Sequence, residues 1–411
     1  MHRDAGLSTE KRCGSADSVA ALGLMPSDSE ALSAAAEITV PPGREDPRPR
    51  LDSVDLVRGI VMILMALDHT RSFFSNVNFY PLDLERTWPA LYWTRWITHY
   101  CAPVFVFLAG TGAFLSTTRG KTTKELSWFL VTRGLWLVLL ECTIIKWFGW
   151  TFSIDFHSIG AGVIWAIGWS MLALAGLVFL PVPWIGLFGV AMIAGHNLFD
   201  RVSAEQFGSI GWLWTILHTG GQVRVGSDFT IAVGYPLIPW IGVMAAGYAF
   251  GKILLWEPER RRKVIFAMGA AMIALFVVLR GFNIYGNPGH WASQKSPLFS
   301  LFSLLNCQKY PPSLAYLLMT LGPALMVLSL FDRIGVPGML KPALVFGRVP
   351  LFYYLLHLPF IHGLALALRR NSCDLPMVYL FWILVIAILY PLCAWFADLK
   401  RRRREVWLSY F

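Results

Sequence analysis

Apolar runs of about 20 residues recur along the chain, and they constrain its fold more than any other feature. A transmembrane helix needs about 20 apolar residues, whereas a strand of a membrane barrel needs about 10 residues of alternating polarity. Charged residues make up only 15% of the chain, against roughly a quarter in a typical soluble domain. We therefore predict an all-α fold, a polytopic bundle of transmembrane helices in a lipid bilayer.

The apolar runs divide into about ten predicted spans, which are separated by polar or Pro-containing breaks. Two longer segments, 200–228 and 283–312, interrupt the series. The first contains "GSIGWLWTILHTGG", which is apolar but too short to cross a bilayer, so it predicts an interfacial or re-entrant helix. The predicted spans lie at 54–74, 97–116, 126–146, 160–180, 182–199, 229–251, 264–282, 313–331, 344–367 and 377–397.

The distribution of Lys and Arg predicts how the spans are oriented. Basic residues cluster in alternate loops, such as 119–124 and 260–263, and in the C-terminal run 400–404, whereas the intervening loops hold far fewer. Cytoplasmic loops of membrane proteins carry this excess, so both termini are predicted to be cytoplasmic. An even number of spans agrees with that orientation.

The first 50 residues differ from the rest of the chain. They are rich in Ala, Ser, Asp, Glu and Pro, and they end in "PPGREDPRPR". No apolar segment follows a basic start, so they do not have the pattern of a signal peptide. We predict a disordered cytoplasmic tail at 1–50 and a membrane domain at 51–411.

Composition and motifs exclude several classes of function. The basic residues behind the net charge of +10 lie in short loops and tails beside the spans, and no compact basic region with interleaved aromatic residues is present, so no nucleic-acid partner is expected. The six cysteines form no CxxC pair. The chain also lacks HExxH, Walker, GxGxxG-after-strand and GxSxG motifs. No metal site is therefore predicted.

The histidines lie on one side of the predicted membrane. Apart from His2, all of them fall in the outer halves of spans or in outer loops. A structural explanation exists, because amphipathic side chains settle near lipid headgroups. That explanation would place histidines at both interfaces, however, so the one-sided distribution favours a polar chamber that opens outward.

The first predicted span carries ionisable residues near both of its ends. Arg58 and His69 are 11 residues apart, so they share a helix face and lie about 16 Å apart along its axis. Asp55 is suited to an ion pair with Arg58 at i,i+3, and holding the helix to its neighbours is the structural alternative for this pair. Asp68 points about 100° away from His69, so it is not automatically the partner of that ring. Ionisable groups inside a span normally face a protein interior or a water-filled cavity.

Five stretches together carry a family resemblance: "RLDSVDLVRGIVMILMALDHTRSFF", "CAPVFVFLAGTGAFL", "YPLIPWIGVMAAGYAFG", "KYPPSLAYLLMTLGPAL" and "FGRVPLFYYLLHLPFIH". In this order, and over about residues 50–411, the chain resembles bacterial members of the heparan-α-glucosaminide N-acetyltransferase catalytic-domain family. Its opening stretch is also similar to the start of membrane acyltransferases that O-acylate surface polysaccharides. There an Arg-Gly pair precedes a His by 11 residues, a pattern that falls here on Arg58, Gly59 and His69.

The resemblance implies an integral multi-pass enzyme of the bacterial plasma (inner) membrane. It implies transfer of an acyl group, usually acetyl, from acetyl-coenzyme A or another acyl-coenzyme A to a sugar or glycan acceptor on the far side of the membrane. His69 would be the general base or acyl-transfer residue, and Arg58 would line the donor path. The expected catalytic residues are His69, Asp68 and His99, and the expected donor-binding residues are Arg58, Asp55 and His357.

The chain departs from the family pattern at two points. Lysosomal members have an Asn in the first-span motif where this chain has Asp68 and His69. Their catalytic His lies in a Trp-rich stretch before the second span, and the comparable stretch here, "ERTWPALYWTRWITHY", offers only His99. His69 and His99 thus remain alternatives for the catalytic base.

Two other classes of function remain open. A transporter or flippase for a sugar or lipid-linked sugar would use the same polar chamber without forming a bond, although no inverted repeat is visible. A non-catalytic membrane assembly partner would not need so many ionisable groups inside its spans. A homo-oligomer is compatible with all of these interpretations.

Overall fold

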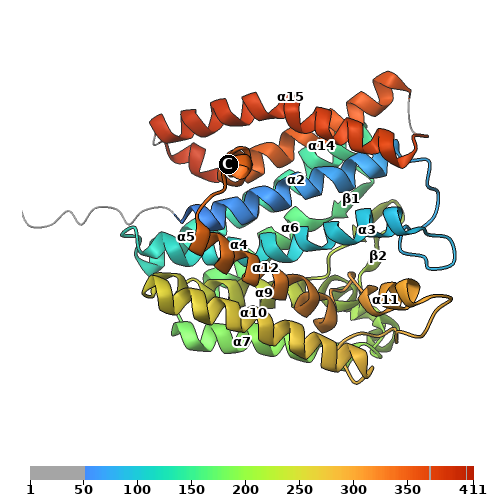
Figure 1. The fold of residues 1–411 in the computed structure, drawn as a ribbon, viewed down its shortest axis with the longest axis horizontal. Helices are drawn as coiled ribbons and strands as arrows, with labels where there is room; N and C mark the ends of the chain where they lie inside the picture. The colour runs from blue at the N-terminus through green and yellow to red at the C-terminus, as the bar shows by residue number, and fades with distance from the viewer. Residues whose placement is uncertain (1–50, 370–371, 404) are drawn as a thin grey trace, which may run out of the picture. The chain divides into compact units, whose positions relative to one another are not determined.

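The computed structural model describes residues 51–369, 372–403 and 405–411, which belong to one unit of the chain. The predicted tail at 1–50 lies outside the described residues, as does Arg404 of the C-terminal basic run. Helices make up most of the described chain, and the long ones run side by side (Figure 1). The predicted helical membrane fold is confirmed in this respect.

The regular helices form where the apolar runs predict them. The α-helices are α2 (Asp52–Phe74), α3 (Pro89–Ile97), α4 (Cys101–Thr117), α5 (Thr123–Leu140), α6 (Val163–Leu177), α7 (Val182–Gly195), α8 (Gly211–Trp214), α9 (Leu237–Phe250), α10 (Pro258–Gly281), α11 (Pro297–Leu305), α12 (Leu314–Ile334), α13 (Lys341–Arg348), α14 (Pro350–Leu368) and α15 (Leu375–Arg402). The 3₁₀ segments are η1 (Thr98–Tyr100), η3 (His196–Phe199), η4 (Ala204–Ile210), η6 (Ile253–Leu255), η7 (Gly338–Leu340) and η8 (Val406–Tyr410), and the π-helical segments are η2 (Glu141–Thr151) and η5 (Thr215–Thr219).

Eight helical stretches in the described part of the chain are long and apolar enough to cross a membrane. They are Pro89–Thr117, Thr123–Thr151, Val182–Phe199, Leu237–Leu255, Pro258–Gly281, Leu314–Ile334, Pro350–Leu368 and Leu375–Arg402. Helix α2 has a sufficient length of 23 residues, but its charged residues are spread from one end to the other and leave no long uncharged stretch. Helix α6 is apolar but only 15 residues long. Each of the ten predicted spans therefore contains a helix, and the protein is an integral multi-pass membrane protein.

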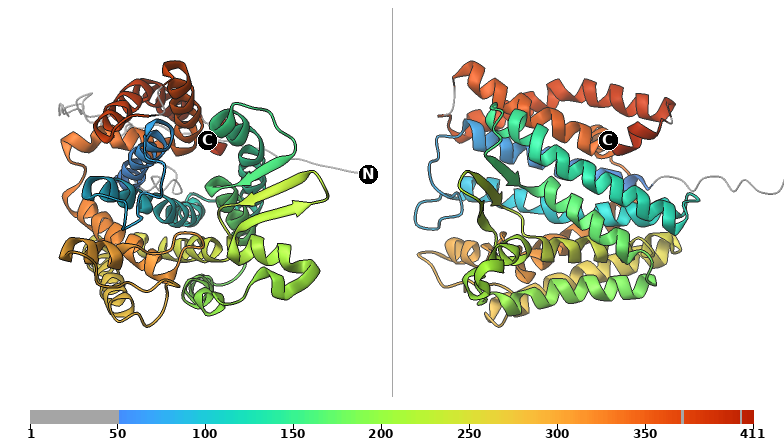
Figure 2. Two further views of the ribbon diagram at one scale, coloured as in Figure 1. Left: turned by 90° about the vertical axis from the view of Figure 1, so that its right-hand side faces the viewer. Right: turned by 180° about the vertical axis from the view of Figure 1, so that it is seen from behind.

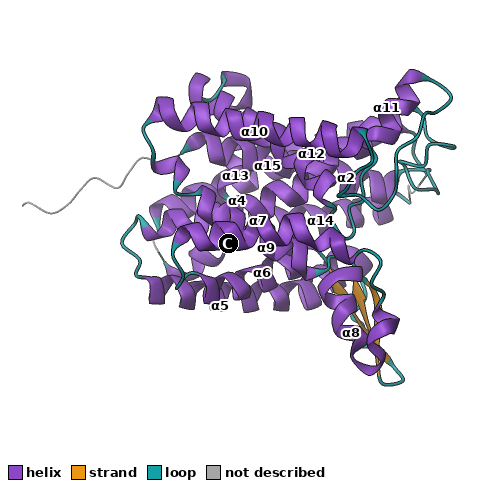
Figure 3. Ribbon diagram, turned by 90° about the horizontal axis from the view of Figure 1, so that it is seen from below, coloured by secondary structure: helices purple, strands orange, loops and turns teal. Residues whose placement is uncertain are grey.

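A small sheet of three strands was not predicted. The strands β1 (Ser158–Ala161), β3 (Phe229–Val233) and β2 (Gly221–Val225) lie in that order, with β1 parallel and β2 antiparallel to β3. The predicted span at 229–251 is wrong at its start, because "FTIAV" pairs as β3 and the helix begins only after Pro236. These short segments are rich in β-branched residues, which favour strands. Figure 3 shows the sheet beside α8.

The predicted span at 344–367 consists of two helices rather than one. Helix α13 ends at Arg348, and α14 begins at Pro350 after Val349, whose φ of −131° and ψ of 51° are not helical. A proline restricts the residue before it to extended conformations and lacks the N–H that would continue the preceding helix. Pro350 therefore starts α14 and separates it from α13.

Helix α2 lies among the other helices of the bundle and contacts α4, α12, α13, α14 and α15. The view along the bundle in Figure 2 shows it between α4 and the C-terminal helices. Its closest neighbour is α13, because two glycines let the backbones touch. A Cβ atom on Gly59 would lie 1.8 Å from the carbonyl oxygen of Ala343, and one on Gly347 would lie 1.8 Å from that of Asp55. Small residues permit such contact between membrane helices.

The two ends of the bundle differ in character. The C-terminal end of α2 lies at the same end as α3, α11 and the sheet, whereas the loop between α4 and α5 and the start of α10 lie at the opposite end (Figure 1). At that opposite end, Asp332 of α12 pairs with Arg261 and Arg262 of α10 over 2.6 and 2.9 Å. The predicted site residues of α2 thus divide between the two ends of the molecule.

Candidate active site

A pair of histidines joins α2 to α14. His69 Nδ1 lies 2.8 Å from His357 Nε2, and the two rings are stacked with centroids 5.0 Å apart. His357 Nδ1 lies in turn 2.8 Å from the carbonyl oxygen of Tyr353, one helical turn earlier in α14. The structure therefore brings together two of the predicted site residues, one expected to be catalytic and one expected to bind the donor.

The hydrogen bonds of this pair determine where its protons lie. A carbonyl oxygen only accepts, so His357 Nδ1–H must donate to Tyr353 and the neutral His357 must present Nε2 as an acceptor. His69 Nδ1–H then donates to His357, which leaves the lone pair of His69 on Nε2. His357 is fully buried, whereas His69 is partly exposed. The exposed ring is thus the one that carries an available base.

The surroundings of His69 are aromatic. The Trp150 ring of η2 stands edge-on to it with centroids 5.4 Å apart, and the Tyr354 ring of α14 does so at 6.2 Å. Trp150 is 41% exposed, so it lies at the edge of this group. Aromatic faces beside a base provide an apolar wall for an incoming substrate.

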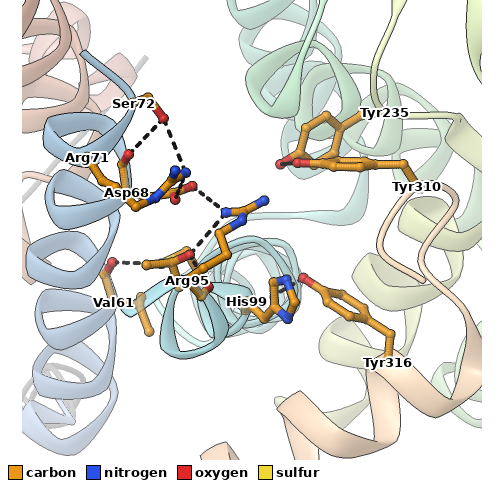
Figure 4. A network of polar contacts seen from close by, with 11 residues as sticks. Val61, Asp68, Arg71, Ser72, Arg95, His99, Tyr235, Tyr310 and Tyr316 are labelled. Carbon is orange, nitrogen blue, oxygen red and sulfur yellow. Dashed lines mark hydrogen bonds and ion pairs between the residues drawn. The ribbon is translucent and has the colours of Figure 1, made fainter. Parts of the chain in front are cut away.

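Asp68 does not contact the His69 ring but pairs with two arginines. Its carboxylate lies 2.7 Å from Arg95 Nη1 and 3.0 Å from Arg71 Nη2 (Figure 4). All three side chains are largely buried. The ion pairs tie α2 to α3, so this geometry gives Asp68 a structural contact that fixes the Arg95 guanidinium.

His99 lies in η1, one helical turn after Arg95, and is fully buried. Its backbone carbonyl accepts a 2.7 Å hydrogen bond from the Tyr316 hydroxyl, and the two rings meet edge-on at 5.3 Å (Figure 4). Neither ring nitrogen of His99 has a hydrogen-bond partner among the described residues. The structure places His99 near the Asp68–Arg95 pair rather than in the His69–His357 pair.

A pair of tyrosines faces Arg95 on the side away from Asp68 (Figure 4). The hydroxyls of Tyr235 and Tyr310 lie 3.4 Å apart, and the Lys309 ammonium lies 5.2 Å from the Tyr310 ring. Burial by itself raises the pKa of the Tyr310 hydroxyl, but the cations of Lys309 and Arg95 outweigh burial and lower that pKa below its ordinary value. Burial and the neighbouring Tyr310 raise the pKa of Tyr235. Tyr310 is thus the better proton donor of the two.

Sequence reasoning did not select these residues for the site. No motif in the sequence singles out Arg95, Lys309, Tyr235 or Tyr310. The spacing of Arg95 and His99, four residues apart, places them on one helix face and could have linked them.

Asp55 and Arg58 lie at the opposite end of α2. Arg58 Nη1 lies 3.0 Å from Asp55 Oδ1 and 3.3 Å from the carbonyl oxygen of Gly347, so it connects α2 to α13. Arg133 of α5 is close enough to Arg58 for the two charges to interact. Two cations whose charges interact therefore lie at this end, about 16 Å along α2 from His69.

Comparison with known families identifies the family of the chain. The sequence model of the family described as "Heparan-alpha-glucosaminide N-acetyltransferase, catalytic" matches residues 50–285, which is more than half of the chain. The match includes His69, Arg95 and His99 and ends before Tyr310 and His357. A comparison with curated proteins gives no match. The resemblance read from the sequence motifs is thus confirmed, and the chain belongs to the heparan-alpha-glucosaminide N-acetyltransferase catalytic family of membrane acetyltransferases.

Proposed function

We propose that the protein transfers an acyl group, usually acetyl, from acyl-coenzyme A to a sugar or glycan acceptor, with His69 as general base. The observation that supports this most directly is the His69–His357 hydrogen bond, because it leaves a lone pair on the partly exposed His69 Nε2. Membership of an acetyltransferase family supports the same reaction class.

The proposed reaction is a direct transfer. His69 Nε2 accepts the proton of an acceptor hydroxyl or amine as its oxygen or nitrogen attacks the thioester carbonyl. The new C–O or C–N bond forms, the C–S bond breaks, and the proton passes from His69 to the coenzyme A thiolate. His357 does not touch the substrate in this scheme. It is a positioning residue that accepts the His69 Nδ1–H, rather than the donor-binding residue expected from the sequence.

The opposite end of α2 supplies the cations that an anionic donor needs. The charges of Arg58 and Arg133 interact there, and arginine is well suited to phosphate groups. Asp55 holds Arg58 in place through its ion pair. The pantetheine arm of coenzyme A is an extended chain, so phosphates bound at this end would allow the thioester to approach His69 across about 16 Å. This arrangement suits a cytoplasmic donor and an acceptor on the outer side.

The groups around Arg95 are proposed to stabilise charge in the transition state. Lys309 and Arg95 are cationic, and Tyr310 is a proton donor with a lowered pKa. Preorganised donors of this kind stabilise the oxyanion that develops on a thioester carbonyl. His99 lies in the same group and is our second candidate for the base. It ranks below His69 because its ring is fully buried and has no exposed nitrogen.

The test uses purified protein in nanodiscs with radiolabelled acetyl-coenzyme A and a panel of sugar acceptors. We expect acetyl transfer in the wild type and a fall in kcat of about 10²- to 10⁴-fold in His69→Ala, the range of general-base catalysis. The matched control is His290→Ala, because His290 is exposed in the segment between α10 and α11 and takes no part in the pair.

Three outcomes would contradict the proposal. Absence of both acetyl transfer and coenzyme A binding in the wild type would exclude the enzyme, and movement of a labelled sugar across liposome membranes without donor would favour the flippase alternative. Loss of activity in His99→Ala with normal activity in His69→Ala would assign the base to His99.

A further inference from the structure

A group of potential metal ligands lies outside the proposed catalytic residues. His196 begins η3 at the end of α7, Asp200 follows one turn later, and His218 lies in η5. Each offers one ligand atom, and these atoms all lie within 4.8 Å of one another. We propose that His196, Asp200 and His218 bind a divalent transition metal ion, with zinc as the ion that fits best.

The two histidines are buried, and several of their ring nitrogens lack a hydrogen-bond partner among the described residues. His196 and His218 are each 2% exposed. His218 Nδ1 and both ring nitrogens of His196 make no hydrogen bond with any described residue, although the carbonyl of Pro312 lies near the His196 ring. A buried polar atom without a partner destabilises the fold. Coordination of a metal ion would satisfy His218 Nδ1 and one of the two ring nitrogens of His196.

The surroundings of the group orient it as a metal site requires. His218 Nε2–H donates to the backbone carbonyl of His196 over 2.9 Å, which leaves Nδ1 with the lone pair. Metal-bound histidines usually donate their second N–H to a carbonyl in this way. The Asp200 carboxylate accepts from Asn197 Nδ2 over 2.9 and 3.2 Å, and the Trp214 ring stacks on His218. Neighbouring residues therefore fix the positions of both His218 and Asp200.

The donor set selects the ion. Two imidazole nitrogens and one carboxylate oxygen suit zinc, whereas calcium and magnesium prefer oxygen ligands alone. Zinc bonds of about 2.1 Å in a tetrahedral site bring ligand atoms to about 3.4 Å apart. Ligand atoms that lie within 4.8 Å of one another would have to move closer by up to about 1.4 Å to bind the ion. The three side chains leave a fourth position for water or another ligand.

The ion would connect segments that are distant in the sequence. His196 and Asp200 follow α7, and His218 comes shortly before β2. Asn197, which holds Asp200, also accepts a 2.8 Å hydrogen bond from the backbone N–H of Leu314 at the start of α12. The metal would therefore fix the end of α7 against the sheet region and, through Asn197, against α12.

The test measures metal content directly. Full-length protein purified with a tag that lacks histidine is dialysed against a chelator, incubated with zinc, desalted and analysed by mass spectrometry of the metal. We expect one zinc ion per chain in the wild type and at least about a tenfold lower affinity in His218→Gln and Asp200→Asn, as loss of a ligand should exceed the 10- to 100-fold effect of second-layer changes. Cobalt in the same site should give the intense visible bands of a four-coordinate ion, which are lost in both variants.

Control and alternative outcomes keep the proposal falsifiable. His290→Gln and His157→Gln change exposed histidines elsewhere and should bind zinc like the wild type. Asp200 is the least buried of the three ligands, so its variant should retain the fold even where His218→Gln does not. The proposal is overturned by a wild-type protein that retains no zinc, or by Asp200→Asn that is folded and binds zinc and cobalt as the wild type does.

Discussion

The proton of His357 decides which nitrogen of His69 is basic, and this gives a prediction at the scale of single residues. His357→Leu removes the acceptor at 2.8 Å from His69 Nδ1, so the His69 ring loses both its orientation and its tautomer. We expect kcat to fall by at least about 10²-fold, the lower range for a general base. His357→Gln retains a carbonyl acceptor and should keep more activity. Equal activity of the Leu variant and the wild type would show that His357 does not position His69.

Asp68 gives a second prediction, on stability. Asp68→Asn removes the charge that neutralises Arg95 and Arg71, whose side chains are only 8% and 11% exposed. An arginine left without its partner in a buried position costs about 3 kcal/mol or more. The melting temperature in detergent should fall, and Arg95→Gln added to Asp68→Asn should recover part of the loss. A double variant that is less stable than the sum of the single ones would contradict this coupling.

The residues of the site could be predicted only in part. The helical repeat placed Arg58 and His69 on one face, and it also showed that Asp68 points away from His69, as the structure has it. The repeat could not show that His357, 288 residues later, approaches His69. Contacts between helices depend on packing, which local periodicity does not contain. Arg95, Lys309 and Tyr310 were missed for the same reason.

At the scale of elements, two glycines on facing helices predict how α2 can pack. Gly59→Ala would place a Cβ atom 1.8 Å from the carbonyl oxygen of Ala343 in α13, and overpacking of this kind costs typically about 1–3 kcal/mol. Gly112→Ala in α4 is the matched control, because a Cβ atom there meets nothing within 4 Å. That change should stabilise the helix by up to about 1 kcal/mol. The two melting temperatures should therefore shift in opposite directions, and a shared direction would contradict the close packing of α2.

The elements themselves were predicted where the apolar pattern is long. Each predicted span contains a helix because about 20 apolar residues in a bilayer must satisfy their own backbone hydrogen bonds. The strands β1–β3 were not predicted, because each has only four or five residues. Such short segments show no reliable alternation of apolar and polar residues. Pro350 indicates the boundary between α13 and α14, but apolar residues occur on both sides of it, so the hydropathy pattern continues across the boundary.

At the scale of the whole molecule, the proposed reaction requires that the two ends of α2 face different compartments. Coenzyme A thioesters are cytoplasmic, so Arg58 should lie near the inner surface and His69 near the outer one. The basic loops 119–124 and 260–263 predict the same orientation. The catalytic proposal and the orientation therefore depend on each other, and a reversed protein would place the base on the donor side.

Labelling of single cysteines tests this orientation. Thr118→Cys lies in the basic loop after α4, and Ser227→Cys lies in the turn between β2 and β3, and both positions are exposed. Cys13 is replaced by Ser. Among the described cysteines all but Cys142 are buried, and burial raises the pKa of the Cys307 thiol to about 12, so background labelling should be low. In intact bacterial cells an impermeant maleimide should label Ser227→Cys at once and Thr118→Cys only after permeabilisation. The opposite result would reverse the topology and, with it, the direction in which the donor reaches His69.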